Sequence, residues 1–293
     1  MKIIPFTIPI AETNSVVVQE DILPHFYHHL HRHKEAQITW IQKGTGTLIV
    51  GNYIQPFKEG DVYILGANQA HLFKSNDAYF KIKNKLEVQS LTIFFNPDGF
   101  FKPLLNLPEF KSIKQFVAIA ENGLQLPQEN TEPIKKQLLK LKTEKKGYLV
   151  SGFILLLQML TDIKNYEVLA TVKAQNTFSD YEGLRMNEVY QYTIMHYKEN
   201  ITLNKIASIA HLTPQAFCRY FKKHTRKTYV TFLNEIRINA ACEILISSKY
   251  DSLTNVAFTT GFSSAISFNK VFKKIIGKSP TQYINEFKST NFN

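Results

Sequence analysis

The pattern of apolar and polar residues changes character after about residue 98. Before that point, short β-branched or aromatic runs alternate with Gly, Pro or Asn, as in QITWIQ, GTLIVG, DVYILG and SLTIFF. Runs of this kind, bounded by turn residues, are typical of strands. Because several follow one another at roughly ten-residue spacing, the pattern predicts a small barrel or sandwich over about residues 1–98.

From residue 99 to 165 the apolar residues recur at helical spacing, first in KSIKQFVAIAEN at 111–122 and again over 133–163. In the second stretch we expect Leu138, Leu139 and Leu141 to share one side of a helix, with lysines on the other. Such a stripe packs most often against its own domain. The second use of the same stripe is an interface between two copies, and we expect a homodimer.

Residues 166–184 are polar and lose this periodicity, which predicts a linker. Residues 185–293 are helical in pattern throughout. The sequence therefore predicts an α+β chain of two domains. The first is a β-barrel with packing helices over 1–165, and the second is an all-α domain over 185–293.

One phrase occurs twice in the helical domain, as FKKHTRKTYVTFL at 221–233 and FKKIIGKSPTQYI at 272–284, 51 residues apart. The similarity extends upstream, where IASIAHLTPQAFCRYFKK at 206–223 aligns with VAFTTGFSSAISFNKVFKK at 256–274. Each copy predicts a short helix, a turn and a second helix, which is the order of a helix-turn-helix.

The residues at the predicted turns support this interpretation. His211 and Gly261 stand at the turn itself, and Thr213 and Ser263 stand where N-caps belong, with side chains that accept backbone N–H bonds. Pro214 fits the first helical position, where no backbone N–H is needed.

The second helix of each copy has two faces. Its phenylalanines form i,i+4 pairs, which point inward: Phe217 with Phe221, and Phe268 with Phe272. The opposite faces carry Gln215, Cys218, Arg219, Lys222 and Lys223 in the first copy, and Ala265, Ile266, Asn269, Lys270 and Lys273 in the second. Arg and Gln can form bidentate contacts to base edges in a major groove, and Lys suits phosphate oxygens. A merely solvated face is the alternative for the lysines alone, but two matching copies favour DNA binding.

Between the copies, residues 229–248 predict one helix of about 30 Å. A rod of that length could hold two recognition helices about one DNA turn, roughly 34 Å, apart on one side of a duplex.

The charge is concentrated in the same domain. From Arg185 onward there are 15 Lys and Arg against 6 Asp and Glu, whereas the rest of the chain has 20 against 18. This asymmetry indicates a polyanionic partner, with double-stranded DNA first and a membrane surface as the alternative. We do not expect a membrane partner, because the basic helices also carry the caps and inward phenylalanines of a folded unit.

The cysteines and the apolar runs bear on location. Cys218 and Cys242 fit no metal or redox spacing, so we interpret them as ordinary thiols in a reducing compartment. The longest apolar run, FILLLQML at 153–160, is too short to span a bilayer, and the N-terminus makes a poor signal peptide. A cytoplasmic location is the expectation.

The repeated segment over about residues 185–287 resembles the AraC/XylS family of bacterial transcription regulators. VAFTTGFSSAISFNKVFKKIIGKSPTQYI is similar to that family's signature almost position by position. The resemblance implies a seven-helix DNA-binding domain whose base-contacting positions are Gln215, Cys218, Arg219, Ala265, Ile266, Asn269 and Lys270. It also implies RNA polymerase as a possible further partner. His211 and Arg226 depart from the pattern, because they stand where the family often has Gly and where a left-handed backbone is expected.

Histidines gather in HFYHHLHRHKEAQITWIQKG at 25–44, and GDVYILGANQAH ends at His71. The spacing of His31, His33, Gln37 and His71 resembles the two cupin motifs, with Gln37 in place of the usual Glu. This resemblance implies a cupin-like barrel that senses a small-molecule effector, often a sugar or related metabolite in such regulators. The expected effector pocket is formed by His31, His33, Gln37, Trp40 and His71, although Trp40 could equally belong to the core.

We expect neither a metal nor another cofactor, and His31, His33 and His71 are only lesser metal candidates because Gln is a weak ligand. The chain shows no nucleophile triad, P-loop or dinucleotide fingerprint, so we do not expect an enzyme. The sequence thus favours an effector-responsive transcription regulator. The alternative is a metal-dependent cupin enzyme fused to a DNA-binding domain.

Overall fold

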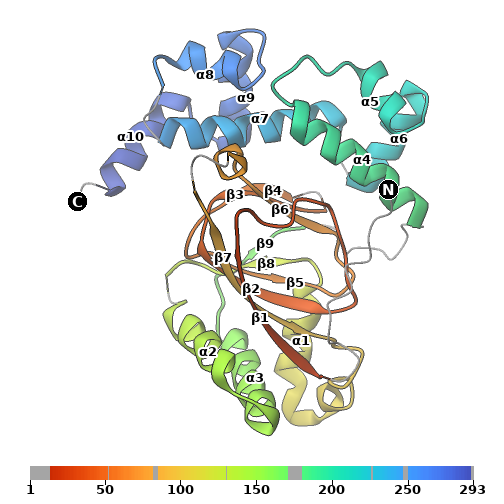
Figure 1. The fold of residues 1–293 in the computed structure, drawn as a ribbon, viewed down its shortest axis with the longest axis vertical. Coiled ribbons are helices and arrows are strands. Elements are labelled where there is room, and N and C mark those ends of the chain that lie inside the picture. The colour runs from red at the N-terminus through yellow and green to blue at the C-terminus, as the bar shows by residue number, and fades with distance from the viewer. Residues whose placement is uncertain are drawn as a thin grey trace. The chain divides into compact units, whose positions relative to one another are not determined.

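The computed structural model describes residues 14–51, 53–81, 85–129, 131–170, 180–225, 227–246 and 250–291. It divides into two compact units, residues 1–180 and 181–293 (Figure 1). The first unit holds all the described strands, and the described part of the second is helical. The predicted α+β class is therefore confirmed. Part of the predicted linker, residues 171–179, lies outside the described residues.

Two antiparallel sheets form the N-terminal unit. One has the strand order β1-β7-β2-β5-β8-β9 and the other the order β4-β3-β6. The bounds are β1 Val16–Leu23, β2 Ala36–Lys43, β3 Gly46–Val50, β4 Tyr53–Phe57, β5 Val62–Leu65, β6 His71–Ser75, β7 Val88–Phe95, β8 Leu124–Gln125 and β9 Glu167–Val168. The last two strands follow residue 98, so the prediction that the sheets end there is wrong.

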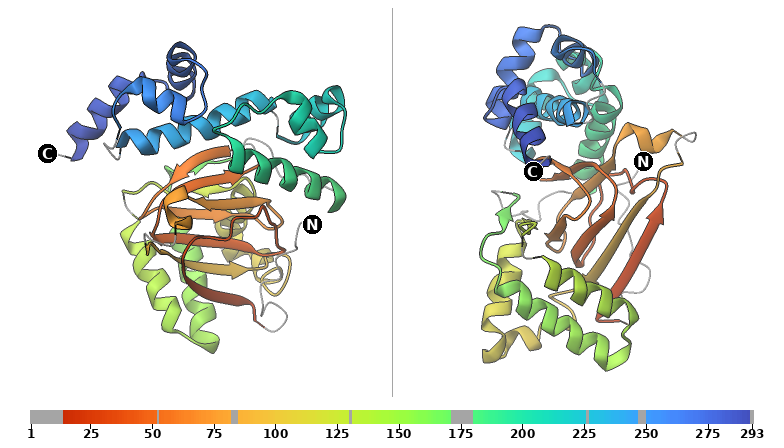
Figure 2. Two further views of the ribbon diagram at one scale, coloured as in Figure 1. Left: turned by 45° about the horizontal axis from the view of Figure 1, so that its top comes forward. Right: turned by 90° about the vertical axis from the view of Figure 1, so that its left-hand side faces the viewer.

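Three helices cover one face of the larger sheet (Figure 2). They are α1 Lys111–Ala120, α2 Glu132–Thr143 and α3 Lys146–Thr161. The stretch over 133–163 is thus two helices, because Glu144 and Lys145 are extended and Lys146 has a φ of 54°. Leu138 and Leu141 are fully buried, but Leu139 is 44% exposed, since it lies about 100° around the helix from Leu138.

Strand β2 separates two apolar cores. Because successive side chains of a strand point to opposite faces, Ala36 and Ile38 join the core beneath the three helices, together with Trp40. Ile41 joins the second core, which includes Leu48 and Phe73 of the smaller sheet. The residues of β2 between them, Gln37 and Thr39, therefore face away from the helices.

Seven helices make up the described part of the C-terminal unit, as the family resemblance implies. They are α4 Asp180–His196, α5 Leu203–Ile209, α6 Pro214–Thr225, α7 Tyr229–Ile246, α8 Leu253–Thr259, α9 Ala265–Ile276 and α10 Pro280–Asn291. Figure 1 shows α5 and α6 near one end of α7 and α8 and α9 toward the other.

The two helix-turn-helix units repeat their contacts as well as their sequence. The ring of Phe221 in α6 lies 5.3 Å from that of Phe232, and the ring of Phe272 in α9 lies 5.7 Å from that of Tyr283, at the equivalent position. An ion pair follows each second helix with the same spacing, Lys227 with Glu235 and Lys278 with Glu286. The repeated phrase therefore encodes one packing unit used twice.

The turns agree with the prediction at three of its four positions. His211 has a φ of 51° and Gly261 a φ of 92°, so both adopt the left-handed conformation. Thr213 caps α6, because its hydroxyl accepts a bond from the Ala216 N–H. The cap of α9 is Ser264 rather than Ser263, and its hydroxyl accepts from the Ser267 N–H. The second copy carries one extra residue before its second helix, which moves the cap by one. Arg226 lies outside the described residues.

Phe268→Ala should lower the free energy of unfolding of the C-terminal unit by about 3–5 kcal/mol, because Phe268 is fully buried and leaves a cavity. Chemical unfolding followed by the helical circular-dichroism signal measures this. Ile266→Ala is the matched control on the exposed face of α9 and should change the value by less than about 0.5 kcal/mol. Equal effects would contradict the assignment of faces.

The two turns should respond in opposite directions to substitution. Gly261→Ala should be strongly destabilising, because a Cβ there would lie 2.5 Å from the carbonyl oxygen of Tyr197. His211→Gly should stabilise by about 0.5 kcal/mol, since relief of a left-handed conformation, about 1–2 kcal/mol, outweighs the added freedom of the unfolded chain. Unfolding midpoints of the two variants measured side by side test this, and a destabilised His211→Gly would contradict it.

Candidate functional site

The outer face of α6 carries the polar residues that the sequence predicts for DNA contact. Phe217 and Phe221 are fully buried on one side of the helix. The predicted contact residues on the other side are all exposed: Gln215, Cys218, Arg219, Lys222 and Lys223. The face is therefore open to a partner along its length.

The equivalent face of α9 is less polar. Ile266 is 83% exposed, an unusual state for a large apolar side chain, and Ala265 is half-buried. Asn269, Lys270 and Lys273 are exposed. Lys274 is exposed as well, and the sequence analysis missed it although it belongs to the repeated Phe-Lys-Lys phrase.

The charge on both faces is uncompensated. Within the described residues, none of Arg219, Lys222, Lys270 and Lys273 has an acidic partner in an ion pair. Lys227, behind the face, is by contrast paired with both carboxylate oxygens of Glu235, at 2.6 and 2.8 Å. Uncompensated cations on exposed helix faces attract phosphate groups.

Helix α7 connects the two recognition helices rigidly. At 1.5 Å per residue its 18 residues span about 27 Å. Phe232 near its start stacks on Tyr190 and touches Phe221, whereas Ile238, Cys242 and Leu245 nearer its end join the core around Phe268 and Phe272. Helix α7 thus contributes to the cores of both helix-turn-helix units.

In the N-terminal unit, three of the predicted pocket residues come together. The ring of His31 lies 4.3 Å from that of His71 and 6.0 Å from that of His33, and the rings of His33 and His71 are 5.2 Å apart. One ring nitrogen from each histidine falls within 4.8 Å of the others. Reciprocal backbone hydrogen bonds between His31 and His71 hold the loop before β2 against β6.

Hydrogen bonds fix the orientation of each of these imidazoles. Nδ1 of His31 donates to the carbonyl oxygen of His29 at 3.0 Å, Nδ1 of His33 to that of Glu35 at 2.8 Å, and Nδ1 of His71 to that of Gln69 at 2.8 Å. Carbonyl oxygens only accept, so in the neutral rings the remaining lone pair is on Nε2.

Burial keeps these imidazoles neutral near pH 7. It lowers the pKa of His31 to about 4 and the pKa of His71 well below its usual value. Burial lowers the pKa of His33 as well, although its bond to Gln37 and the nearby Glu35 carboxylate oppose the shift.

Gln37 links the histidines to the interior of the sheet. Its Oε1 lies 3.0 Å from Nε2 of His33, and its amide nitrogen donates to the Thr39 hydroxyl at 3.1 Å. That hydroxyl lies 3.1 Å from the hydroxyl of Thr92 in β7. The chain of polar groups is buried throughout.

Trp40 does not belong to this cluster. It points to the opposite face of β2 from Gln37, packs against the core beneath the helices, and has the ammonium of Lys135 5.9 Å from its ring centre. Of the two roles that the sequence leaves open for Trp40, the structure supports the core, because residues three apart on a strand face opposite sides.

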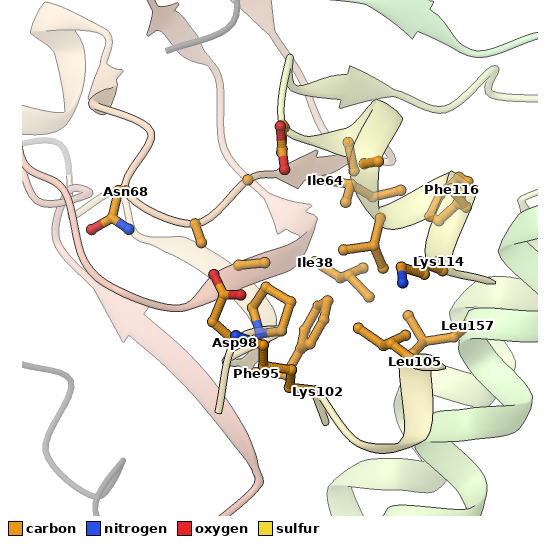
Figure 3. A pocket seen from close by; sticks show the side chains of 18 of the residues that line it. Ile38, Ile64, Asn68, Phe95, Asp98, Lys102, Leu105, Lys114, Phe116 and Leu157 are labelled. Atoms are coloured by element: carbon orange, nitrogen blue, oxygen red, sulfur yellow. The ribbon is translucent and has the colours of Figure 1, made fainter. Parts of the chain in front are cut away.

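A cavity of about 350 Å³ lies on the Trp40 side of β2 instead, between the larger sheet and the helices (Figure 3). Its apolar wall includes Ile38, Ile64, Phe95, Leu105, Phe116 and Leu157. Asp98, Lys102 and Lys114 stand at its exposed margin. The sequence pattern gives no sign of this cavity, because the residues of its wall come from strands and helices that are distant in the chain.

None of the helices, as far as the structure describes the chain, is long and apolar enough to cross a membrane.

Comparison with known proteins separates the same two regions. Residues 14–144 match the family model of an AraC-like ligand binding domain, and residues 206–286 match a helix-turn-helix domain. The chain is 23% identical over 258 residues to the uncharacterized HTH-type transcriptional regulator YdeC of Bacillus subtilis. The aligned region covers 87% of this chain and 85% of YdeC. It is 23% identical over 261 residues to the HTH-type transcriptional activator RhaS of Escherichia fergusonii, with 86% of each chain covered.

Among solved structures, the DNA-binding domain of AdpA in complex with a target DNA is 26% identical, with a TM-score of 0.34, and covers 36% of this chain and 93% of that one. Since the two family models and the full-length relatives agree, the chain belongs to the AraC family of transcription regulators, with an N-terminal ligand-binding domain and a C-terminal helix-turn-helix domain that binds DNA.

Proposed function

We propose that this regulator places α6 and α9 in two successive major-groove segments of its operator and responds to a small molecule bound in the N-terminal unit. The observation that carries the proposal is the uncompensated positive charge on equivalent faces of two helices that share α7. The span of α7, about 27 Å, is close to the roughly 34 Å between successive major-groove segments on one side of a duplex.

Within this proposal the two helices contribute differently. Arg219 and Gln215 of α6 can form bidentate contacts to guanine and adenine, so α6 supplies most of the base specificity. Ile266 of α9 suits the methyl group of thymine, and Lys270 and Lys273 suit phosphate oxygens. Exposure of Ile266 supports this role, because an apolar side chain gains by burial in the groove.

We assign the effector to the cavity beneath the helices rather than to the histidine cluster. Its volume is typical of a small-molecule site, and apolar walls with a few polar groups at the margin are the usual lining. The lining also includes Asn68, Asp98, Lys102, Asn106, Lys114 and Glu121, so the effector class is a small molecule with both apolar and polar groups.

The remaining partners stay predictions. A homodimer through the α2–α3 surface is supported by apolar side chains that remain exposed there: Leu139, Tyr148 and Leu155. RNA polymerase is the partner of a promoter-bound regulator that acts on initiation. That the chain lacks enzymatic activity is also a prediction.

Arg219→Ala and Gln215→Ala should each weaken binding to the protein's own promoter region by about 1–3 kcal/mol, the value of one bidentate base contact. Binding to unrelated DNA should change little for Gln215→Ala, because a neutral side chain adds nothing to phosphate attraction. Fluorescence anisotropy titrations on both DNAs at fixed salt measure the difference.

Lys222→Ala is the contrasting variant. It should weaken binding to both DNAs alike and reduce the slope of log K against log salt by about one, as expected for a phosphate contact. Lys58→Ala, at an exposed position between β4 and β5, serves as the charge control and should leave both affinities unchanged. Wild-type affinity and sequence preference in Arg219→Ala would overturn the assignment of α6.

Compounds that stabilise the full-length protein in a thermal-shift screen of metabolites should also change the emission of Trp40. Trp40 is the single tryptophan and packs on the cavity side of β2. Ala36→Leu, which fills part of the cavity, should remove both responses, whereas Gln37→Glu on the opposite face should preserve them. Responses that survive Ala36→Leu would place the effector elsewhere.

A further inference from the structure

The two halves of the DNA-binding domain touch each other directly, besides sharing α7. Gly261, in the turn of the second helix-turn-helix unit, lies against the segment that follows α4. A Cβ at this position would be 2.5 Å from the carbonyl oxygen of Tyr197 and 3.0 Å from Cα of Lys198. Such a close approach of two backbones requires a residue without a Cβ. The turn of the second unit is therefore in contact with the end of α4.

Arg237 of α7 stands at the centre of this contact. Its Nε donates to the carbonyl oxygen of Tyr197 and its Nη2 to that of Glu199, both at 2.8 Å. These carbonyls come just after the last residue of α4, where a helix leaves backbone acceptors unpaired and favours a positive charge. The guanidinium thus pairs the end of α4 from another helix.

The same guanidinium also contacts the core of the second unit. Its Cζ lies 5.7 Å from the centre of the Phe262 ring, and that buried ring lies 5.4 Å from the ring of Phe268 in α9. At the other end of the domain, the ring of Tyr190 in α4 lies 6.3 Å from that of Phe221 in α6. A continuous series of contacts therefore leads from α6 through α4 and Arg237 to α9.

The repeat in the sequence does not account for an arginine at this position. Helices α4 and α7 are equivalent members of the two copies, because each ends six residues before the short helix that follows it. The turn residues His211 and Gly261 are 50 residues apart, and the same shift aligns position 237 with Asn187. Arg237 is thus a feature of the second copy alone, at the place where that copy meets the end of α4.

We infer that Arg237 is a positioning residue for DNA recognition, which fixes the angle of α9 relative to α6 and thereby the separation of the two DNA segments that the regulator accepts. The statement about DNA rests on the proposed function, in which the two helices enter successive major-groove segments. Long helices bend gently, so α7 sets the distance between the units more firmly than their angle. A second contact beside the axis of α7 removes this freedom.

The first measurement is the distance between spin labels on α6 and α9, made on the full-length protein without DNA. Cys218 on α6 is exposed and takes one label, Asn269→Cys on the exposed face of α9 takes the other, and Cys242 is buried and stays unchanged. Dilution with unlabelled protein removes distances between copies. We expect one narrow distance distribution in this background and a broader or displaced one after Arg237→Ala. Arg237→Lys should have the same effect, because an ammonium keeps the charge but lacks the planar fork that reaches two carbonyls.

Lys278→Ala is the matched control, since it removes an ion pair of the second unit that takes no part in this contact. It should leave the distribution narrow and its mean unchanged. Circular dichroism identifies the variants that keep their helices, and Arg237→Lys carries the test if Arg237→Ala unfolds. A distribution as narrow as the background, at the same mean, in the folded Arg237 variant would overturn the inference.

The second measurement tests the consequence for DNA, on the protein's own promoter region after footprinting has located the two protected segments. One base pair inserted between them should weaken binding of the wild type by roughly tenfold, the cost of a misplaced base contact. Arg237→Ala should bind the natural spacing more weakly than the wild type but lose less on the insertion, because α9 can follow the displaced segment. Fluorescence anisotropy at fixed salt measures both losses, and a merely destabilised protein would keep the wild-type preference for spacing.

The two measurements separate this inference from the proposed function. If the label distances change but both proteins lose equally on the insertion, Arg237 orients the units and the proposed placement of α6 and α9 on DNA is wrong. If the label distances do not change, the role of Arg237 is wrong whatever the DNA result.

Discussion

The burial of α7 in both helix-turn-helix units is the contact on which the DNA-binding surface depends. Phe232 anchors the first unit against the start of α7, and the residues around Cys242 anchor the second nearer its end. Because both recognition helices pack on one rod, neither can turn its basic face without disturbing a core of close-packed aromatic rings. The repeated ion pairs, Lys227 with Glu235 and Lys278 with Glu286, join the turn after each second helix to the helix that follows it. The packing on α7 therefore fixes the spacing of α6 and α9.

Strand β2 has a comparable role in the N-terminal unit. Its alternating side chains supply Ala36 and Ile38 to the cavity beneath the helices and Gln37 and Thr39 to the buried polar chain behind the histidines. Two chemically different sites thus lie back to back across one strand. A ligand in the cavity can bias the unit only through a difference in affinity between its conformations.

The polar residues divide in the same way between exposure and burial. Within the described residues, Arg219, Lys222, Lys270 and Lys273 are exposed and have no acidic partner, so their attraction for phosphate is available to a partner and depends on salt. In the histidine cluster His33 and His71 are buried and His31 is half-buried, and burial keeps the three imidazoles neutral near pH 7. Exposure suits binding to a polyanion.

Much of the C-terminal domain follows from the sequence alone, because its determinants are local. A capping residue, a left-handed turn residue and phenylalanines four residues apart specify each unit, although the cap of the second unit is Ser264 and not the predicted Ser263. The repeat at 51 residues shows that the unit occurs twice. The N-terminal sites are different. Spacing predicted that His31, His33 and Gln37 lie together, but it left Trp40 open between pocket and core and gave no sign of the cavity. That cavity is formed by Ile38, Phe116 and Leu157, which meet only when the helices fold onto the sheet, so long-range packing and not local pattern decided it.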